Sequence, residues 1–226
     1  MRLLLTSGGI KNDSIHASLL ELLGKPIAES SALIIPTATY AFPGGPQSAW
    51  KIITGRAASP LCELGWGSVG VLELSALPSI DREHWVSAVE QTDALLVGGG
   101  DPLYLSYWMR QSGLADLFET LTETVYVGVS AGSLVVGPCI GGDVSDLSPL
   151  AGGDSTLGVV DFAIFPHLDR PDMPDFDMAN AARWASGLSV PGYAIDDETA
   201  IKVVDGVAEV VSEGHWELMT PSTDRG

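Results

Sequence analysis

The chain has 226 residues, of which 46% are hydrophobic and 18% are charged. A chain of this length and hydrophobicity buries enough apolar surface to offset the entropy of ordering, which argues against intrinsic disorder. Lys and Arg number 11 and Asp and Glu 29, so the formal net charge is −18. Nucleic acids and anionic membrane surfaces are therefore not expected as partners, because phosphate binding requires clustered cations.

Targeting signals and metal sites are not expected either. The apolar run at the N-terminus ends at Thr6 and is too short for a signal peptide, and no window is long enough to cross a membrane. Cys62 and Cys139 lack a CxxC or His-rich neighbourhood, which favours buried free thiols over a zinc site. The chain is predicted to be soluble and cytoplasmic.

Short runs rich in Leu, Ile and Val alternate with longer helix-like segments up to residue 137. Strands are predicted over 2–6, 32–36, 69–74, 94–97 and 125–129, and helices over 13–23, 46–57, 81–89 and 103–120. Asp13 or Ser14 is expected to cap the first helix, and Gly24 to follow its end. Continuous apolar strands that alternate with helices predict a doubly wound, mostly parallel α/β sheet.

The pattern changes after residue 137. Long loops are predicted over 138–158 and 168–176, and short strands follow from residue 193, with a hairpin turn at Asp205-Gly206. No repeat or linker divides the chain, so residues 1–220 are predicted to form one domain and 221–226 a frayed tail.

The sequence GVSAG at 128–132 is the strongest chemical motif. It is a G-x-S-x-G sequence between a predicted strand and the apolar run 133–136, which is the setting of a nucleophile elbow. Small neighbours let the backbone turn tightly at Ser130, and the following helix start offers free N–H groups to an oxyanion. Ser130 is therefore predicted to be a nucleophile, with an ordinary small-residue turn as the alternative.

A second glycine-rich turn, GGGDP at 98–102, also follows a predicted strand. It is not a Walker A loop, because no Lys-Ser/Thr follows, and Leu103 breaks the dinucleotide fingerprint. An oxyanion-hole or substrate-cradling turn remains, because ligands of open α/β sheets bind at the carboxyl ends of strands.

A serine nucleophile needs a base. His16 and His84 fall within predicted helices and are expected to have surface or packing roles. His167 follows an apolar run at the start of an acidic loop, where a catalytic base is commonly held. His215 is the rival, because it would complete the Ser–Asp–His order of an α/β-hydrolase.

Several of these segments together resemble the peptidase E and cyanophycinase family of serine peptidases. They are LLLTSGG, VGGGDPLYL, VGVSAGSLVVGP with the later FPH, and IDDETAI. The resemblance spans most of the chain. It implies a flavodoxin-like, class I glutamine-amidotransferase-like α/β fold with a C-terminal hairpin, and a serine peptidase that needs neither metal nor cofactor.

The resemblance also assigns roles to residues. It implies Ser130 as the nucleophile, His167 as the general base, and the amides of Gly99, Gly100 and Ala131 as the oxyanion hole.

The acid of the triad is less direct. Members that are aspartyl dipeptidases carry an Asp where this chain has Ser145. Other members use a carboxylate of the late strand, which favours Asp197, with Asp143 second and Glu198 third.

The resemblance further suggests an aspartyl dipeptidase that cleaves N-terminal Asp-X. An aspartyl side chain calls for a cation, and Arg170 and Arg183 are the candidates, although Arg170 could equally pair with an Asp in LDRPD. A β-aspartyl (cyanophycin-like) peptidase and a non-catalytic small-molecule-binding module are the alternatives. The expected partner is a small peptide, and a homodimer is left open.

Overall fold

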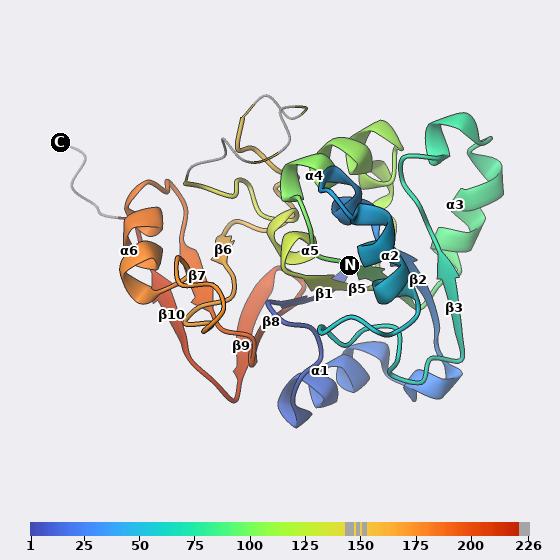
Figure 1. Ribbon diagram of the computed structural model, residues 1–226. Coiled ribbons are helices and arrows are strands. Elements are labelled where there is room, and N and C mark those ends of the chain that lie inside the picture. Colours follow the sequence, from blue (N-terminus) through green and yellow to red (C-terminus); the bar gives the residue numbers. More distant parts are fainter. Residues whose placement is uncertain (143–146, 148–149, 151–152, 222–226) are drawn as a thin grey trace.

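A seven-stranded sheet forms the centre of the molecule (Figure 1). The computed structural model describes residues 1–142, 147, 150 and 153–221. In spatial order the strands are β3 (Ser68–Val71), β2 (Ser31–Ile35), β4 (Ala94–Val97), β5 (Val125–Val129), β1 (Arg2–Thr6), β8 (Thr199–Val204) and β9 (Val207–Ser212). The strands from β3 to β1 pair in parallel, whereas β8 and β9 pair antiparallel. The predicted mostly parallel sheet with a C-terminal hairpin is confirmed.

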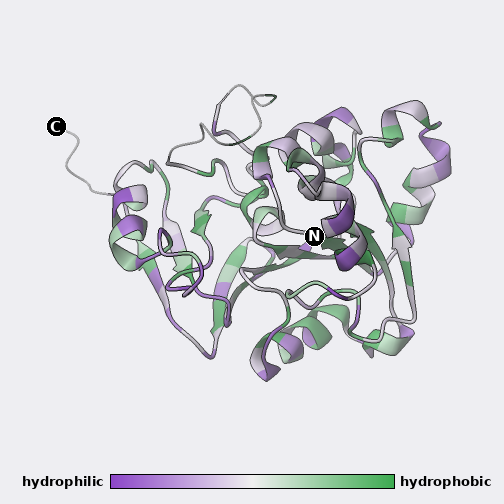
Figure 2. Ribbon diagram, viewed as in Figure 1, coloured by the Kyte–Doolittle hydropathy of each residue, from purple (hydrophilic) through white to green (hydrophobic). Residues whose placement is uncertain are grey.

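Helices cover both faces of this sheet (Figure 1). The helices of the structure are α1 (Asp13–Leu23), α2 (Gly45–Ile53), α3 (Glu83–Glu90), α4 (Pro102–Gln111), α5 (Ala131–Leu134) and α6 (Met178–Ser186), with short 3-10 helices at Ile27–Glu29, Thr37–Ala41, Leu77–Ser79 and Ala115–Leu117. Helix α6 lies away from this sheet, at the left in Figure 1. Leu19 of α1 packs with Leu96 on one face, and Leu105 of α4 packs with Leu95 on the other. Figure 2 shows the hydrophobic residues gathered along the sheet between these layers. Burial on both faces explains why the parallel strands are continuously apolar.

Helix α1 has the predicted bounds, but its N-cap differs from the prediction. Asn12, rather than Asp13 or Ser14, is the N-cap, and its side-chain oxygen accepts a hydrogen bond from Ile15 N–H at 2.9 Å. Its extended backbone is the conformation that a cap requires. Gly24 ends the helix in the left-handed conformation, with φ 68°, as predicted.

Two other helices are shorter than predicted. The predicted helix over 46–57 ends at Ile53. The one over 103–120 divides after Gln111, where Gly113 adopts φ 78° and turns the chain out of the helix.

A second sheet, which the sequence analysis did not predict, lies beside the first one (left in Figure 1). Its strands, in spatial order, are β10 (Trp216–Met219), β7 (Gly192–Ile195) and β6 (Ala163–Phe165). Helix α6 connects β6 to β7, and its Trp184 packs with Ala163. Because β6 precedes His167 and β7 precedes Asp197, this small sheet carries both candidate triad partners of Ser130.

Three further sequence predictions concern a membrane span, the C-terminal tail and the two cysteines. No helix within the described residues is both long and apolar enough to cross a membrane. Apart from Pro221, the tail predicted over 221–226 lies outside the described residues. Cys62 and Cys139 are free thiols, as predicted, but both are half-buried rather than buried.

Cys62 is expected to react slowly with alkylating agents. Burial, together with the nearby Glu63 carboxylate, raises the pKa of the Cys62 thiol to about 11. At about pH 8 only roughly 0.1% of the thiol is then ionised, against roughly a quarter of an unperturbed cysteine, so alkylation by iodoacetamide should be about 100-fold slower than that of a cysteine peptide. Peptide mapping of a Cys139→Ser variant measures the rate, which should rise about tenfold per pH unit up to about pH 10. A rate equal to that of the peptide would contradict the assignment.

Candidate active site

Ser130 lies at a sharp turn between β5 and α5. Its backbone has φ 50° and ψ −115°, a conformation that non-glycine residues rarely adopt. The flanking glycines make the turn possible. A Cβ on Gly128 would lie 2.6 Å from the Gly132 carbonyl oxygen, and a Cβ on Gly132 would collide with the Val97 carbonyl. This strand–turn–helix geometry is that of a nucleophile elbow, the setting that the G-x-S-x-G motif predicted.

The end of β1 holds this strained turn in place. The Thr6 carbonyl accepts hydrogen bonds from Ser130 N–H at 3.0 Å and from Ser133 Oγ at 2.7 Å. Thr6 Oγ1 in turn donates to the Gly128 carbonyl at 2.7 Å. Because β1 and β5 are neighbouring parallel strands, the segment that follows β1 also emerges next to Ser130.

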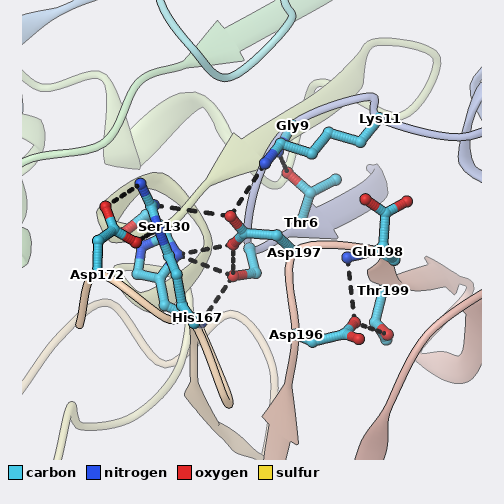
Figure 3. A network of polar contacts seen from close by, with 12 residues as sticks. Thr6, Gly9, Lys11, Ser130, His167, Asp172, Asp196, Asp197, Glu198 and Thr199 are labelled. Carbon is cyan, nitrogen blue, oxygen red and sulfur yellow. Dashed lines mark hydrogen bonds and ion pairs between the residues drawn. The ribbon is translucent and has the colours of Figure 1, made fainter. Parts of the chain in front are cut away.

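His167 and Asp197 continue the site from Ser130. His167 Nε2 lies 2.9 Å from Ser130 Oγ, and His167 Nδ1 lies 2.8 Å from Asp197 Oδ1. The side chains of His167 and Asp197 are 11% and 17% exposed, so both are largely shielded from water. Figure 3 shows Asp197 between His167 and Lys11. This chain of contacts can move a proton from the serine hydroxyl to the imidazole and stabilise the resulting imidazolium.

The rival base and acids lie elsewhere or outside the described residues. His215 Nδ1 faces Asp169 Oδ2 at 3.0 Å, so the α/β-hydrolase order is not assembled around the candidate nucleophile. The Glu198 carboxylate accepts a hydrogen bond from the Asn12 side chain at 3.2 Å. Asp143 is not among the described residues. In the described part of the chain, Asp197 is the carboxylate that contacts the candidate base.

The Asp197 carboxylate has further polar neighbours. Its Oδ1 accepts a hydrogen bond from Ser7 Oγ at 2.8 Å. Its Oδ2 accepts one from Lys11 Nζ at 3.0 Å and lies 3.6 Å from Arg170 Nη1. Burial alone would raise the pKa of Asp197, but the hydrogen bonds that it accepts, that of His167 first, outweigh burial and hold its pKa well below the usual range. Asp197 is therefore ionised at neutral pH.

The glycine-rich turn after β4 lies against the elbow. A Cβ on Gly99 would be 3.4 Å from the Ser130 Cβ. Gly100 has φ 138° and runs so close to the Ala38 backbone that no side chain would fit. Among the described residues, the N–H groups of Gly99, Gly100 and Ala131 have no hydrogen-bond acceptor. Gly99 lies beside Ser130 and Ala131 follows it in the chain, so their N–H groups can donate to an oxyanion at the serine.

A cavity of about 310 Å³ opens beside Ser130 and His167. Its wall includes the cationic side chains of Lys51 and Arg170, and no Asp or Glu of the described residues lines it. Arg170 is paired with Asp172, whereas Lys51 has no ion pair among the described residues. A larger hollow of about 1080 Å³, lined in part by Arg110, includes neither Ser130 nor His167. The described residues contain no cluster of three or more His, Cys, Asp or Glu side chains that could hold a metal ion.

A comparison with protein families identifies the family of this chain. The model of peptidase family S51 matches residues 3–211. The chain belongs to peptidase family S51. This S51 peptidase is therefore a serine peptidase, a hydrolase, and the non-catalytic alternative is not supported. A comparison with curated proteins found no match.

Solved structures share the fold of this S51 peptidase. A candidate peptidase E protein from Listeria monocytogenes EGD-e aligns with a TM-score of 0.68 and 17% identity, over 94% of this chain and 98% of that chain. A peptidase from an acI-B1 Actinobacterium aligns with a TM-score of 0.70 and 20% identity, over 97% of this chain and 90% of that chain. At these identities the likeness concerns the fold, and it confirms the predicted peptidase E-like architecture.

The arginines predicted to bind substrate in this S51 peptidase lie in different places. Arg170 lines the cavity, and its guanidinium is paired with Asp172 through Nε at 2.7 Å and Nη2 at 3.1 Å. Arg183 lies on α6, donates a hydrogen bond to the Asn180 side chain and is not part of the cavity wall. Arg170 therefore lines the cavity beside Ser130, whereas Arg183 does not.

Sequence reasoning missed Ser7, Lys11 and Lys51. Ser7 and Lys11 both contact the Asp197 carboxylate, and Lys51 lines the cavity. A signal for Ser7 was present, because it directly follows a strand, at the sheet edge where the other site residues lie. Lys51 carried no such signal, since nothing local distinguishes it from a solvent-facing lysine of a helix.

Proposed function

We propose that this S51 peptidase cleaves short peptides by acyl transfer to Ser130. The hydrogen-bonded chain from Ser130 through His167 to Asp197 carries the proposal. Ser130 Oγ attacks the scissile carbonyl carbon while His167 Nε2 takes the hydroxyl proton. The imidazolium then protonates the leaving amine, and the neutral imidazole activates the water that hydrolyses the acyl-enzyme. Asp197 keeps the proton on Nδ1 and stabilises the imidazolium.

The oxyanion of the tetrahedral intermediate is proposed to bind the amides of Gly99, Gly100 and Ala131. Ala131 begins α5, so no preceding turn of the helix supplies a carbonyl oxygen to accept a hydrogen bond from its N–H. The closeness of Gly99 to Ser130 supports a place for the second donor in the turn after β4. Preorganised amides of this kind contribute most where water is excluded.

The charge of the cavity favours a substrate with a carboxylate close to the scissile bond. Arg170 shares its guanidinium with Asp172, whereas Lys51 forms no ion pair within the described residues. An aspartyl side chain would supply the missing partner, and an arginine side chain would be repelled. The peptidase is therefore proposed to be an aspartyl dipeptidase that cleaves Asp-X, in preference to a β-aspartyl-arginine peptidase.

Hydrolysis of a dipeptide panel tests this proposal. Wild type and Ser130→Ala are incubated with Asp-Leu, Leu-Leu, Gly-Leu and β-Asp-Arg, and the released amino acids are quantified. We expect cleavage of Asp-Leu that the substitution abolishes. Serine-dependent cleavage of β-Asp-Arg or Leu-Leu at an equal rate would keep the mechanism and refute the specificity. Equal cleavage by both proteins would refute the mechanism.

Removal of the Lys51 charge should weaken the binding of an acidic substrate. We expect Lys51→Met to raise KM for Asp-Leu about 3- to 10-fold with kcat little changed, because a charge-assisted contact is lost and the alkyl stem is kept. Added salt should reduce the difference in KM between wild type and Lys51→Met, because it screens the charge of Lys51. Lys25→Met, which removes a lysine paired with Asp93 at 2.8 Å, is the matched control. An unchanged KM in Lys51→Met would remove this residue from the specificity account.

The remaining parts of the proposal rest on the sequence. They are a cytoplasmic location, a small-peptide partner, and a reaction without metal or cofactor, for which EDTA should leave the rate unchanged. Self-association into a homodimer is a matter for a solution measurement of mass.

A further inference from the structure

We propose that Ser7 is a positioning residue of the catalytic site, which fixes both the orientation and the proton of His167. This inference rests on the proposed function, because it takes His167 as the base and Asp197 as its acid. Ser7 directly follows β1 and is fully buried. Its hydroxyl lies next to three atoms of the site: His167 N at 2.7 Å, Asp197 Oδ1 at 2.8 Å and His167 Nδ1 at 3.2 Å.

The donors and acceptors around Ser7 determine where its proton lies. The main-chain N–H of His167 is only a donor, so it occupies a lone pair of Ser7 Oγ. The Asp197 carboxylate is only an acceptor when ionised, and a charged acceptor competes more strongly than a neutral ring nitrogen. The Ser7 proton is therefore directed at Asp197 Oδ1. His167 Nδ1 must then carry its own proton to meet the same oxygen at 2.8 Å, which leaves the Nε2 lone pair facing Ser130.

Ser7 also supports the backbone of the base. His167 has φ 59°, a left-handed conformation that is costly for a residue other than glycine. Its buried N–H would lack a partner without Ser7 Oγ. On the other side, a Cβ on Gly8 would lie 2.8 Å from the Asp197 Cβ, so the chain after Ser7 runs directly against the acid. Ser7 thus joins β1 to the two loops that carry the base and the acid.

Removal of Ser7 takes away one hydrogen bond to Asp197 and leaves the other charged groups around this carboxylate in place. Lys11 and Arg170 face Oδ2, whereas Ser7 and His167 share Oδ1. Loss of the Ser7 donor leaves Asp197 more basic, so it holds the imidazolium more tightly. The protonated, inactive form of the base then persists to higher pH.

Kinetics of the Ser7 variants test the proposal. In Ser7→Ala we expect kcat to fall about 10- to 100-fold, the range for a lost hydrogen bond to a charged group, with KM nearly unchanged because Ser7 does not line the cavity. The acid limb of the pH profile of kcat/KM should also move to higher pH. Ser7→Thr keeps the hydroxyl and should restore most of the wild-type kcat and pH profile. Ser106→Ala removes another fully buried serine, hydrogen-bonded to Arg110, and should change neither kcat nor the pH profile.

The outcomes separate this inference from the proposed function. A folded Ser7→Ala with the kcat and pH profile of wild type overturns the role of Ser7, provided that Ser130→Ala is inactive. If Ser130→Ala is as active as wild type, the proposed function itself fails. Should Ser7→Ala not fold, Ser7→Cys decides, because a thiol has a similar shape but donates and accepts weakly. Ser7→Cys should show the same loss of kcat and the same shift of the acid limb of kcat/KM to higher pH. A wild-type kcat and pH profile in this variant would overturn the proposal.

Discussion

Ser130→Ala is expected to lower kcat for peptide hydrolysis by about 10⁴- to 10⁶-fold, because the nucleophile acts as a unit with its base and acid. The methyl group cannot form the acyl-enzyme, and only the oxyanion donors and the binding cavity remain. The fold should persist, since the turn is held by hydrogen bonds of Thr6 that the substitution leaves in place. Steady-state hydrolysis of Asp-Leu, with thermal unfolding of the same samples, measures both effects.

The strain at Ser130 provides a matched control. Alanine keeps a Cβ in the φ 50° conformation, whereas glycine adopts it freely. Ser130→Gly should therefore be as inactive as Ser130→Ala but more stable by about 1 kcal/mol. Equal stability of the two variants would show that the turn relaxes around alanine. Retention of a tenth of the wild-type activity by either variant would contradict a nucleophilic role.

Asp197→Asn is expected to lower kcat by about 10³- to 10⁴-fold while leaving the shape of the site intact. An amide that donates toward His167 Nδ1 favours the tautomer with the proton on Nε2, which then cannot accept the proton of Ser130. The substitution also removes the charge that stabilises the imidazolium. Glu198→Gln and Asp143→Asn are the matched controls, and each should stay within about threefold of wild type. A large loss in either control, together with an active Asp197→Asn, would move the acid to another residue.

The same variant has a stability readout with a defined sign. Because the pKa of Asp197 is depressed in the folded state, its charge stabilises the fold above the unfolded-state pKa of about 3.9. That stabilisation is lost as the pH falls through the lower, folded-state pKa. The difference in unfolding free energy between wild type and Asp197→Asn should thus be constant near neutrality and shrink in acid. A difference that grows in acid would contradict the depressed pKa.

The sequence predicted the parallel half of the fold well because its signals are local. The bounds of β1, α1, β4 and β5 agree with the predicted ranges, since continuous apolar runs and a left-handed Gly24 mark them directly. The second sheet was not predicted, because β6 and β7 are short strands separated by α6, and their pairing is a long-range contact.

The candidate site was predictable where a motif carried it. Ser130 and the glycine turn lie in recognisable strand–turn–helix settings, and the family resemblance selected His167 and Asp197. Arg183 does not line the cavity beside Ser130, and its role stays a prediction, because nearness in sequence to His167 says little about where α6 directs its side chains. Ser7 was missed although it directly follows β1 at the sheet edge of the site, because its contacts with His167 and Asp197 are long-range and appear only in the structure.

Covalent labelling by a fluorophosphonate, located by peptide mapping, tests the central claim most directly because it requires no knowledge of the substrate. The account predicts one adduct, on Ser130, in wild type, and no adduct in Ser130→Ala. Labelling should be slowed in His167→Ala and in Asp197→Asn, since both lower the basicity available to the hydroxyl. An unlabelled wild type, or an adduct that persists in Ser130→Ala, would contradict a serine nucleophile activated by His167 and Asp197.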